Sequence, residues 1–495
     1  MPLFDTSVAA VLLRLDRNPF HHGTLGAARS LGRAGVPVHV VAGGAAGPVA
    51  RSRHVRSCHP GPPVTEADAG AGAGGGGGTA AVREALVRVA DALAGAPAVL
   101  LALDELTAVA LDGLRREPGG PAGRFLLPAQ PPGLPALVAD KARLAAVCLR
   151  LGVPHPRTLV PADADEAAAM AAALGTPVVA KWSRPWLLPA GRGLRSTVLA
   201  RTPGRARELY ARAAEAGSPL LLQRYLPPSG DGDWFFHAYC DAGGSCGVAG
   251  TGRKVRSWPG GAGLTAVGEW APNPAVEHLA RDLLSALGYR GIADLDFRRD
   301  PATGRYHLLD FNPRPGAQFR LFTDARGTDV VRALHLDLTG RPVPALAPAH
   351  GRRYVVENHA ALSLLAAPRP RPRAHAGPGG VETAWYAADD PAPARAMARA
   401  WAAHLARRAT AAVCGALRHA LRHALRHALR RARRCSWRAW RAGTARRALD
   451  PTARPTPATA LSRAPHGAAP GPFPAPAVPP ELPLPPFPTP SSPRR

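Results

Sequence analysis

The chain has 495 residues, of which 46% are hydrophobic, and its formal net charge is +27. At roughly 100–200 residues per domain, this length predicts two to four units and excludes a single small core. The charge is uneven, because residues 401–495 carry 17 arginines against only Asp450 and Glu481, so more than half of the excess belongs to a tail rather than to a basic folded domain.

The cysteines and the apolar runs predict the compartment. The six cysteines include no CxxC pair, and Cys148 falls on the apolar face of an expected helix, so we expect reduced thiols and no zinc site. The N-terminal stretch MPLFDTSVAAVLLRLD lacks a basic leader. No uninterrupted apolar run approaches the roughly 20 residues of a membrane span, so we expect a cytoplasmic protein.

The first unit, residues 1–130, has the pattern of a small parallel α/β domain. Its expected strands are Val8–Leu15, Val36–Val41 and Ala98–Leu103, and its expected helices are Gly23–Ala34 and Ala80–Leu93. A glycine-rich linker separates its two halves at 69–78. The glycine-bearing turn GTLGAARSLG fits either an anion site at a helix start or a simple tight turn.

The second unit, residues 131–345, predicts an α+β fold with mostly antiparallel strands. Asp140 is a candidate N-cap for a helix that stops at Gly152. The other expected helices are Ala164–Leu174, Arg205–Glu215 and Val276–Leu287, and the expected strands are Val178–Lys181, Leu220–Leu222, Trp234–Cys240, Cys246–Thr251, Gly291–Phe297 and Arg305–Phe311. A loop rich in Gly and Pro is expected at Ser183–Gly193.

The C-terminal part divides by composition. Residues 346–400 form an extension without a clear pattern, and residues 401–450 contain the basic repeat ALRHALRHALRHALRRARR, typical of a helix that binds polyanions weakly or of simple repeat expansion. Its histidines at i, i+4 spacing lack supporting carboxylates, so we interpret them as part of the repeat. Residues 451–495 are rich in proline and predict a disordered tail.

The stretch LLDFNPRPGAQ carries the strongest chemical signal. On a strand, Asp310, Asn312 and Arg314 share one face while Phe311 points to the core. Upstream, GIADLDF places Asp294 and Asp296 on one face of a second strand, which an antiparallel pairing would bring beside Asp310. Paired carboxylates repel unless a cation lies between them, so a Mg²⁺ site competes with the simpler reading of a salt-bridged strand face.

Lysine is scarce in this chain, with three residues among 62 basic ones. These are Lys141, Lys181, in the stretch PVVAKWSRP, and Lys254. Because an ammonium is a compact point charge and a guanidinium a bulkier fork, the three positions are candidates for phosphate contacts.

Taken together, these motifs resemble the ATP-grasp superfamily of carboxylate–amine ligases over residues 131–345, with a preceding α/β domain. The resemblance implies ATP contacts for Lys141 and Lys181, and for an adenine hinge and its surroundings at Gln223, Arg224, Tyr225, Leu226 and Asp233. It implies Mg²⁺, as two ions with Mn²⁺ as an alternative, on Asp296, Asp310 and Asn312. Lys254 and Arg314 would act on the reacting groups.

The same resemblance implies the reaction. ATP would phosphorylate a small-molecule carboxylic acid, and an amine would then displace phosphate to form an amide. The substrate is expected between His22–Gly26 and Arg314. Two alternatives stay open: bicarbonate activation by the same apparatus, and nucleic-acid binding by the basic tail. The sequence is compatible with a homo-oligomer and names neither acid nor amine.

Overall fold

The computed structural model describes residues 3–16, 18–43, 47–62, 76–189, 192–230, 232–260, 263–366 and 379–410. Residues Met1–Trp401 form one compact unit, and a second unit covers Ala402–Arg495, of which 402–410 are described as helix. The basic repeat and the Pro-rich tail therefore lie outside the described residues. No described helix is long and apolar enough to cross a membrane.

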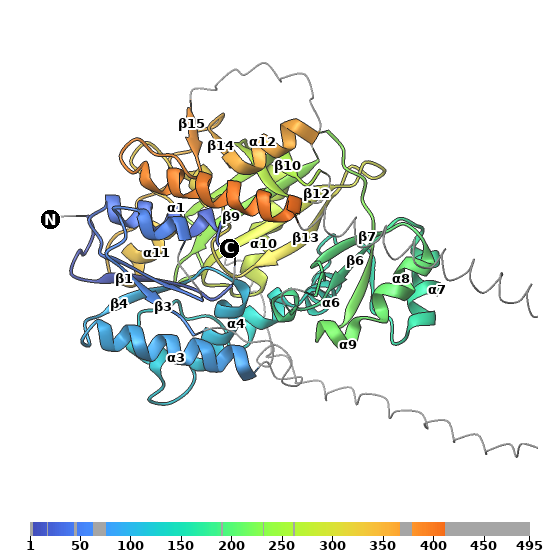
Figure 1. The fold of residues 1–495 in the computed structure, drawn as a ribbon, viewed down its shortest axis with the longest axis horizontal. Helices are drawn as coiled ribbons and strands as arrows, with labels where there is room; N and C mark the ends of the chain where they lie inside the picture. The colour runs from blue at the N-terminus through green and yellow to red at the C-terminus, as the bar shows by residue number, and fades with distance from the viewer. Residues whose placement is uncertain are drawn as a thin grey trace, which may run out of the picture. The chain divides into compact units, whose positions relative to one another are not determined.

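The N-terminal sheet, which lies in the blue part of Figure 1, is parallel, as predicted, and its strand order is β3-β2-β1-β4. Its elements are β1 (Ala9–Arg14), α1 (His22–Arg33), β2 (Val38–Ala42), β3 (Ser57–Pro60), α3 (Gly76–Ala92), β4 (Ala98–Ala102) and α4 (Glu105–Leu114). The strands are short apolar runs, and every residue of β1 is buried. Strand order reverses between β1 and β4, so their carboxyl ends mark the edge where such sheets bind ligands.

A four-stranded antiparallel sheet follows, in the order β5-β8-β6-β7. Its strands are β5 (Thr158–Leu159), β6 (Val178–Trp182), β7 (Thr197–Ala200) and β8 (Leu220–Arg224), and the helices of this region are α5 (Leu134–Ala139), α6 (Lys141–Arg150), α7 (Ala164–Leu174), α8 (Pro203–Tyr210) and α9 (Ala213–Ala216). Asp140 caps α6 as predicted, because its carboxylate accepts hydrogen bonds from the backbone N–H groups of Ala142 and Arg143.

The largest sheet has seven strands in the order β13-β12-β9-β10-β11-β14-β15. They are β9 (Asp233–Cys240), β10 (Val248–Trp258), β11 (Leu264–Trp270), β12 (Gly291–Arg299), β13 (Tyr306–Asn312), β14 (Arg353–Val355) and β15 (Val381–Thr383), accompanied by α10 (Pro274–Ala286), α11 (Val330–Leu338) and α12 (Glu357–Ala366). All its pairs are antiparallel except β14 with β15. The expected fold class, a parallel α/β unit followed by two antiparallel lobes, is thus present.

Glycines on β10 let aromatic side chains pack directly against its backbone. A Cβ placed on Gly250 would lie 2.6 Å from the Phe322 ring, and one on Gly252 would lie 2.6 Å from the Phe235 ring. Both rings are fully buried in a hydrophobic cluster that also contains Leu12 and Leu25 of the N-terminal unit. The cluster therefore joins the N-terminal sheet to the large sheet through one continuous core.

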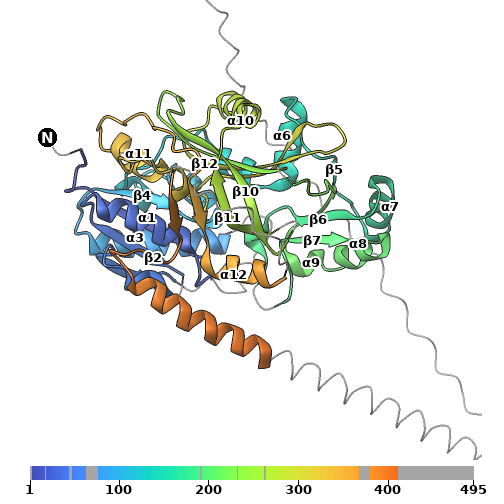
Figure 2. The same cartoon turned by 90° about the horizontal axis from the view of Figure 1, so that it is seen from above.

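The extension after residue 345 adds two strands to the edge of the large sheet. Strands β14 and β15 pair at its edge. Farther on, residues 392–410 are helical (orange in Figure 2), and the Trp401 ring packs edge-on against Phe20 with ring centroids 4.9 Å apart. The pattern of the sequence missed these strands because each has only three residues and lacks an alternating apolar face.

The expectation of reduced cysteines is wrong at one place. Cys240 and Cys246 form a disulfide across the turn between β9 and β10. They lie six residues apart, a spacing without a redox or metal signature, and they become neighbours only once the two strands pair. Cys58 and Cys148 are free, and Cys148 is buried as its helical position predicted.

Candidate active site

Two neighbouring strands bring the predicted carboxylates together. In the antiparallel ladder of β12 and β13, Asp296 lies opposite Asp310, as the alternation of the sequence predicted, and Asp294 lies opposite Asn312. The pairing slips by one residue after Asp296, which leaves Leu309 as the extra residue of a bulge. Bulges of this kind re-aim side chains and are common beside active sites.

The three lysines of the chain reach the strand ends that carry these carboxylates from three different elements. Lys141, the first residue of α6, forms an ion pair with Asp310. Lys254 on β10 places Nζ 2.7 Å from Asp296 Oδ1. Lys181 on β6 donates from Nζ to the carbonyl of Leu309 at 3.1 Å, so the bulge supplies its acceptor. We call Lys141, Lys181, Lys254, Asp296 and Asp310 the site cluster.

Burial and neighbouring charges set the proton affinities of this cluster. Burial lowers the pKa of Lys181 to about 8, although Asp310 acts in the opposite direction. Burial by itself would raise the pKa of Asp310, but Lys141 and Lys181 more than offset it, so that pKa is lowered. The pKa of Asp296 is raised by burial and by Asp294, which Lys254 only partly counteracts. Perturbed groups of this kind concentrate at functional sites.

Arg314 lies at the end of the cluster toward the N-terminal unit. Its Nη2 donates to Glu105 Oε1 at 2.6 Å, and its Nη1 lies 3.8 Å from Asp294 Oδ2. Burial opposes the charged guanidinium, yet Glu105 and Asp294 together raise its pKa. The Asn312 amide donates to the same Asp294 at 3.2 Å. Of the predicted row, Asp310 therefore contacts a lysine, whereas Asn312 and Arg314 contact Asp294.

The sequence reasoning missed two partners of this row. Glu105, the first residue of α4, pairs with Arg314 from the N-terminal unit. His237, fully buried on β9, places Nε2 3.0 Å from Asp294 Oδ1. Each was visible only as a polar interruption, in the runs LLALDEL and WFFHAYC. Such an interruption signals a buried polar contact but does not identify the partner.

The side chains of the predicted adenine hinge are held by protein partners. Gln223 donates to Thr158 Oγ1 at 3.1 Å, Arg224 pairs with Asp300 at 2.7 Å, and Asp233 pairs with Arg298 at 2.5 Å. Leu226 is buried, and its carbonyl accepts from Arg298 at 3.0 Å. Tyr225 follows the end of β8. These residues connect the small sheet to the large one, and a nucleotide contact through their backbone stays a prediction.

The loop after β6 ties two of the lysines together. The backbone N–H of Lys141 donates to the Ser183 carbonyl at 2.9 Å, and the Ser183 hydroxyl bonds the N-cap Asp140. Because Ser183 lies two residues after Lys181, these hydrogen bonds fix the position of the start of α6 relative to the end of β6. The loop continues through a short 3₁₀ turn at Pro185–Leu187, and residues 190–191 lie outside the described chain.

The donor set fits a magnesium ion shared with phosphates. Mg²⁺ is usually held by one or two carboxylates together with substrate phosphates and water. Asp296 and Asp310 supply two such carboxylates on facing strands, and the raised pKa of Asp296 is what a cation would relieve. Among the described residues no group of three or more His, Cys, Asp or Glu forms an all-protein metal cage. The role of Asn312 as a third ligand stays a prediction.

No family model and no curated protein matches the chain. Among similar solved structures, carboxyaminoimidazole ribonucleotide synthase from Aspergillus clavatus complexed with ATP is 14% identical, with 69% of this chain and 79% of that chain covered and a TM-score of 0.49. The N5-carboxyaminoimidazole ribonucleotide synthetase from Thermus thermophilus is 18% identical, with 68% and 80% covered and a TM-score of 0.48. Biotin carboxylase from Campylobacter jejuni is 16% identical, with 69% and 73% covered and a TM-score of 0.48. At these low values the chemistry must be argued from this chain's own residues.

Proposed function

We propose that the protein is an ATP-dependent carboxylate–amine ligase that forms an amide through an acyl phosphate and releases ADP and phosphate. The observation that carries this proposal is the convergence of all three lysines of the chain on one end of β12 and β13, where Lys141 pairs with Asp310, Lys254 pairs with Asp296, and Lys181 donates to the Leu309 carbonyl beside Asp310. A chain that otherwise uses arginine for positive charge keeps its ammonium groups at one place, where they can enter between phosphate oxygens.

In the proposed first step the phosphates of ATP would lie against Lys141 and Lys181, and Asp296 and Asp310 are the residues that would hold Mg²⁺. Bound Mg²⁺ would neutralise the charge that develops on the phosphates. An oxygen of the substrate carboxylate attacks the γ-phosphorus, the bond from that phosphorus to the bridging oxygen breaks, and ADP leaves. The lysine ammonium groups stabilise the transferred phosphoryl group electrostatically.

In the second step the amine nitrogen attacks the acyl carbon, the bond to the phosphate oxygen breaks, and the nitrogen loses a proton. Lys254 lies on β10 of the large sheet, whereas Lys181 lies on β6 of the small sheet, and Lys254 would stabilise the charge of the reacting group. Arg314, held by Glu105 at 2.6 Å, would orient the carboxylate. The substrate would thus lie at the carboxyl edge of the N-terminal sheet.

The expected substrate position near the start of α1 needs one adjustment. A Cβ on Gly23 would lie 2.9 Å from the Ala317 backbone, so the helix start packs directly on the segment after Arg314. No room for a ligand exists at Gly23 itself. The space for substrate is therefore expected beside Arg314 rather than above the first turn of α1.

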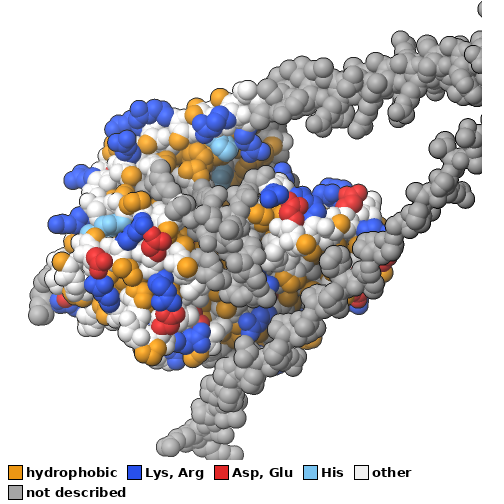
Figure 3. All heavy atoms as spheres, turned by 60° about the horizontal axis from the view of Figure 1, so that its bottom comes forward, with side chains coloured by type: hydrophobic (Ala, Val, Ile, Leu, Met, Phe, Trp, Pro, Cys, Tyr) orange, Lys and Arg blue, Asp and Glu red, His pale blue; other side chains and the backbone are white. Residues whose placement is uncertain are grey.

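Nucleic-acid binding by the described part of the chain is less well supported. On the face drawn in Figure 3, several acidic side chains lie beside basic ones on the lower part and on the lobe at the right, so basic side chains do not dominate these parts of the face. More than half of the excess of positive charge belongs to residues 401–495, most of which lie outside the described chain.

Trapping the acyl phosphate tests the proposal. The full-length protein is incubated with ATP, Mg²⁺, hydroxylamine and a set of carboxylic acids, and both hydroxamate and ADP are measured. We expect hydroxamate in amounts that match ADP, and its loss in Asp310→Asn with the circular dichroism spectrum unchanged. ADP release that depends on bicarbonate instead of an organic acid would replace amide formation by bicarbonate activation. Absence of ATP turnover with every acid, and equal turnover in Asp310→Asn, would each contradict the proposed site.

A further inference from the structure

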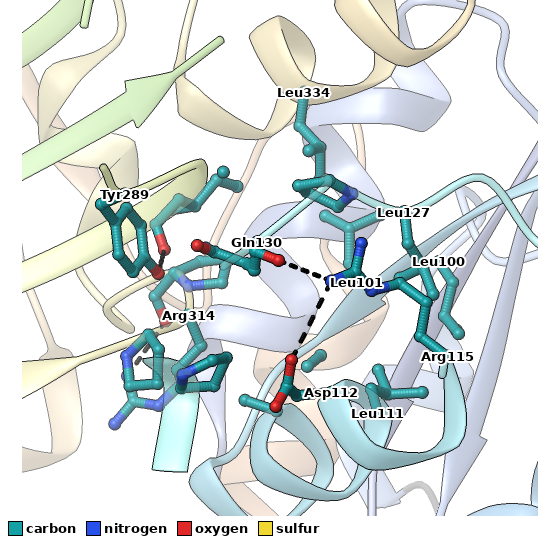
Figure 4. A pocket seen from close by; sticks show the side chains of 18 residues that line it. Leu100, Leu101, Leu111, Asp112, Arg115, Leu127, Gln130, Tyr289, Arg314 and Leu334 are labelled. Carbon is teal, nitrogen blue, oxygen red and sulfur yellow. Dashed lines mark hydrogen bonds and ion pairs between the residues drawn. The ribbon is translucent and has the colours of Figure 1, made fainter. Parts of the chain in front are cut away.

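A cavity of about 90 Å³ lies beside Arg314, between the N-terminal unit and the large sheet (Figure 4). Its walls come from the end of β4, helix α4, the segment around 127–135, and the residues that flank β12 and β13. The apolar wall includes Leu101, Ala108, Leu111, Leu127, Ile292 and Leu334. Arg314 lines the cavity and also belongs to the candidate active site, so the two lie next to each other.

Two of the polar groups in the lining are occupied by protein partners. Arg115 donates from Nη2 to the Gln130 carbonyl at 2.6 Å. The Gln130 side chain in turn accepts from the Arg290 backbone N–H at 3.1 Å. These contacts hold Arg115 and Gln130 in place in the wall.

Two other polar atoms of the lining have no hydrogen-bond partner among the described residues. They are the acceptor Asp112 Oδ1 and the donor Arg314 Nε. Asp112 is only 6% exposed, and its other oxygen accepts from the Gly133 backbone N–H at 2.9 Å. That second oxygen also pairs with Arg116 at 3.2 Å, and Arg115 lies 4.0 Å from Oδ1. Buried polar atoms normally find partners, so unpaired ones at a cavity point to a ligand.

We propose that this cavity binds the hydrocarbon body of the carboxylic acid on which the ligase acts. The acid would be a short branched aliphatic acid that carries a hydroxyl or amino group. Its carboxylate would lie at Arg314, its apolar chain against the leucines, and its hydrogen-bond donor at Asp112. This assignment of substrate class rests on the proposed ligase function.

The volume sets the size of the acid. An engineered apolar cavity of about 150 Å³ binds benzene, so 90 Å³ suits a smaller group of about three to five carbons. Each methylene that fits the cavity should improve affinity roughly fourfold, and a methylene that does not fit should reverse the gain. Acetate should therefore bind weakly, 2-hydroxy-4-methylpentanoate should bind best, and succinate, which would bury a second carboxylate among leucines, should not compete.

The test is a binding series measured by isothermal titration calorimetry on the full-length protein without ATP. The probes are acetate, 3-methylbutanoate, 2-hydroxy-4-methylpentanoate, 5-methylhexanoate and succinate. We expect the hydroxy acid to bind at least tenfold more tightly than acetate. A flat series, or no binding by any acid, would overturn the proposal.

Two variants change the size of the cavity in opposite directions. Leu127→Ala should enlarge it and shift the preference toward 5-methylhexanoate, while Ala102→Val should fill it and shift the preference toward shorter acids. Leu93→Ala is the matched control, because Leu93 packs on the same N-terminal core without lining the cavity. A general loss of packing would weaken all acids alike, so opposite shifts in preference support the proposal and unshifted preferences overturn it.

ADP release with the same acids separates this inference from the ligase function. Size-selective binding of acids without ADP release would support the proposal that the cavity binds the acid and would contradict the proposed ligase activity. ADP release that ignores chain length, and that Leu127→Ala and Ala102→Val leave unshifted, would keep the ligase and overturn the cavity assignment.

Discussion

Two groups of buried charges in this protein are built differently. The extension cluster, which we define as Arg29, Ser52 and Asp390, joins helix α1 to the segment before residue 392. Asp390 accepts hydrogen bonds from Arg29 Nε at 3.0 Å, Ser52 Oγ at 2.6 Å and the Arg53 backbone N–H at 3.0 Å. The site cluster instead pairs its carboxylates with lysines.

The difference teaches how to separate a structural charge from a candidate functional one. A carboxylate that accepts from a guanidinium fork, a hydroxyl and a backbone N–H has its lone pairs satisfied by the protein and holds two segments together. In the site cluster Asp296 pairs with Lys254 and Lys181 donates to a backbone carbonyl, yet burial still raises the pKa of Asp296 and lowers that of Lys181, so the protein partners stabilise these two charges only in part. That is the electrostatic state expected of a site that awaits phosphates and a cation.

The largest predicted effect concerns the extension cluster. Arg29→Met should lower the free energy of unfolding by about 3–5 kcal/mol, because it leaves the buried Asp390 without its cation. The side chains of Arg29 and Asp390 are 4% and 2% exposed. Urea unfolding measures the change.

The neighbouring pair Arg33–Asp389 gives a matched control. Its side chains are 30% and 44% exposed, and Arg33→Met should cost less than about 1 kcal/mol because solvent screens the pair. Equal losses in the two variants would contradict the structural role assigned to the extension cluster.

The sequence correctly predicted most features that depend on side-chain alternation along strands and on the capping of helices. The pairing of Asp296 with Asp310 follows from the side-chain alternation of two strands joined by the turn at 300–304, and the cap at Asp140 places Lys141 at the start of α6. These features depend on residues close in the chain, so local rules suffice.

What the sequence could not supply depends on contacts between distant segments. Glu105 meets Arg314 across 209 positions, and His237 meets Asp294 between strands whose order no local pattern reveals. β11 was missed because its residues LTAVGEW contain a glycine and no clean apolar alternation. The Cys240–Cys246 disulfide likewise required the β9–β10 pairing to be known.

The second prediction tests whether the lysines of the site cluster are specific. Lys181→Arg keeps the charge but adds a planar group in a buried position, and disturbing a desolvated charge pair costs roughly 2–5 kcal/mol, or about 30-fold to several thousand-fold in ATP affinity. Lys141→Arg should act in the same way, whereas Lys254→Arg should lower turnover more than ATP binding. The measurements are the ATP dissociation constant and the ADP release rate. If all three arginine variants leave both quantities nearly unchanged, the lysines have no specific role at phosphates, and their scarcity is an accident of composition.

The third prediction follows from the pKa of Lys181, which burial lowers to about 8. Phosphates bind the protonated ammonium, so ATP affinity should be constant below pH 8 and fall by up to tenfold per unit above it. Stability has the opposite sign: the unfolded chain binds more protons between pH 8 and the ordinary lysine pKa of about 10.4, so this group makes the protein more stable as the pH rises through that window. Lys181→Met should remove both dependences, and a wild-type profile that persists in this variant would assign them to another group.

The smallest predicted effect on catalysis comes from removing the C-terminal tail. A chain that ends at Thr410 keeps every residue of the site cluster, the strands β14 and β15, and Trp401, whose ring packs on Phe20. Its ADP release should therefore stay within about twofold of the full chain, since substitutions and deletions away from buried contacts usually change little.

Most of the affinity for polyanions should disappear, because residues 401–495 hold 17 arginines and most of these are removed. Turnover and retention on heparin, each measured at two salt concentrations, check both statements. If a chain ending at Thr410 folds but has lost ATP turnover, part of the active site lies in the tail. The site cluster would then not contain the whole active site, and its contrast with the structural extension cluster would no longer identify functional charges.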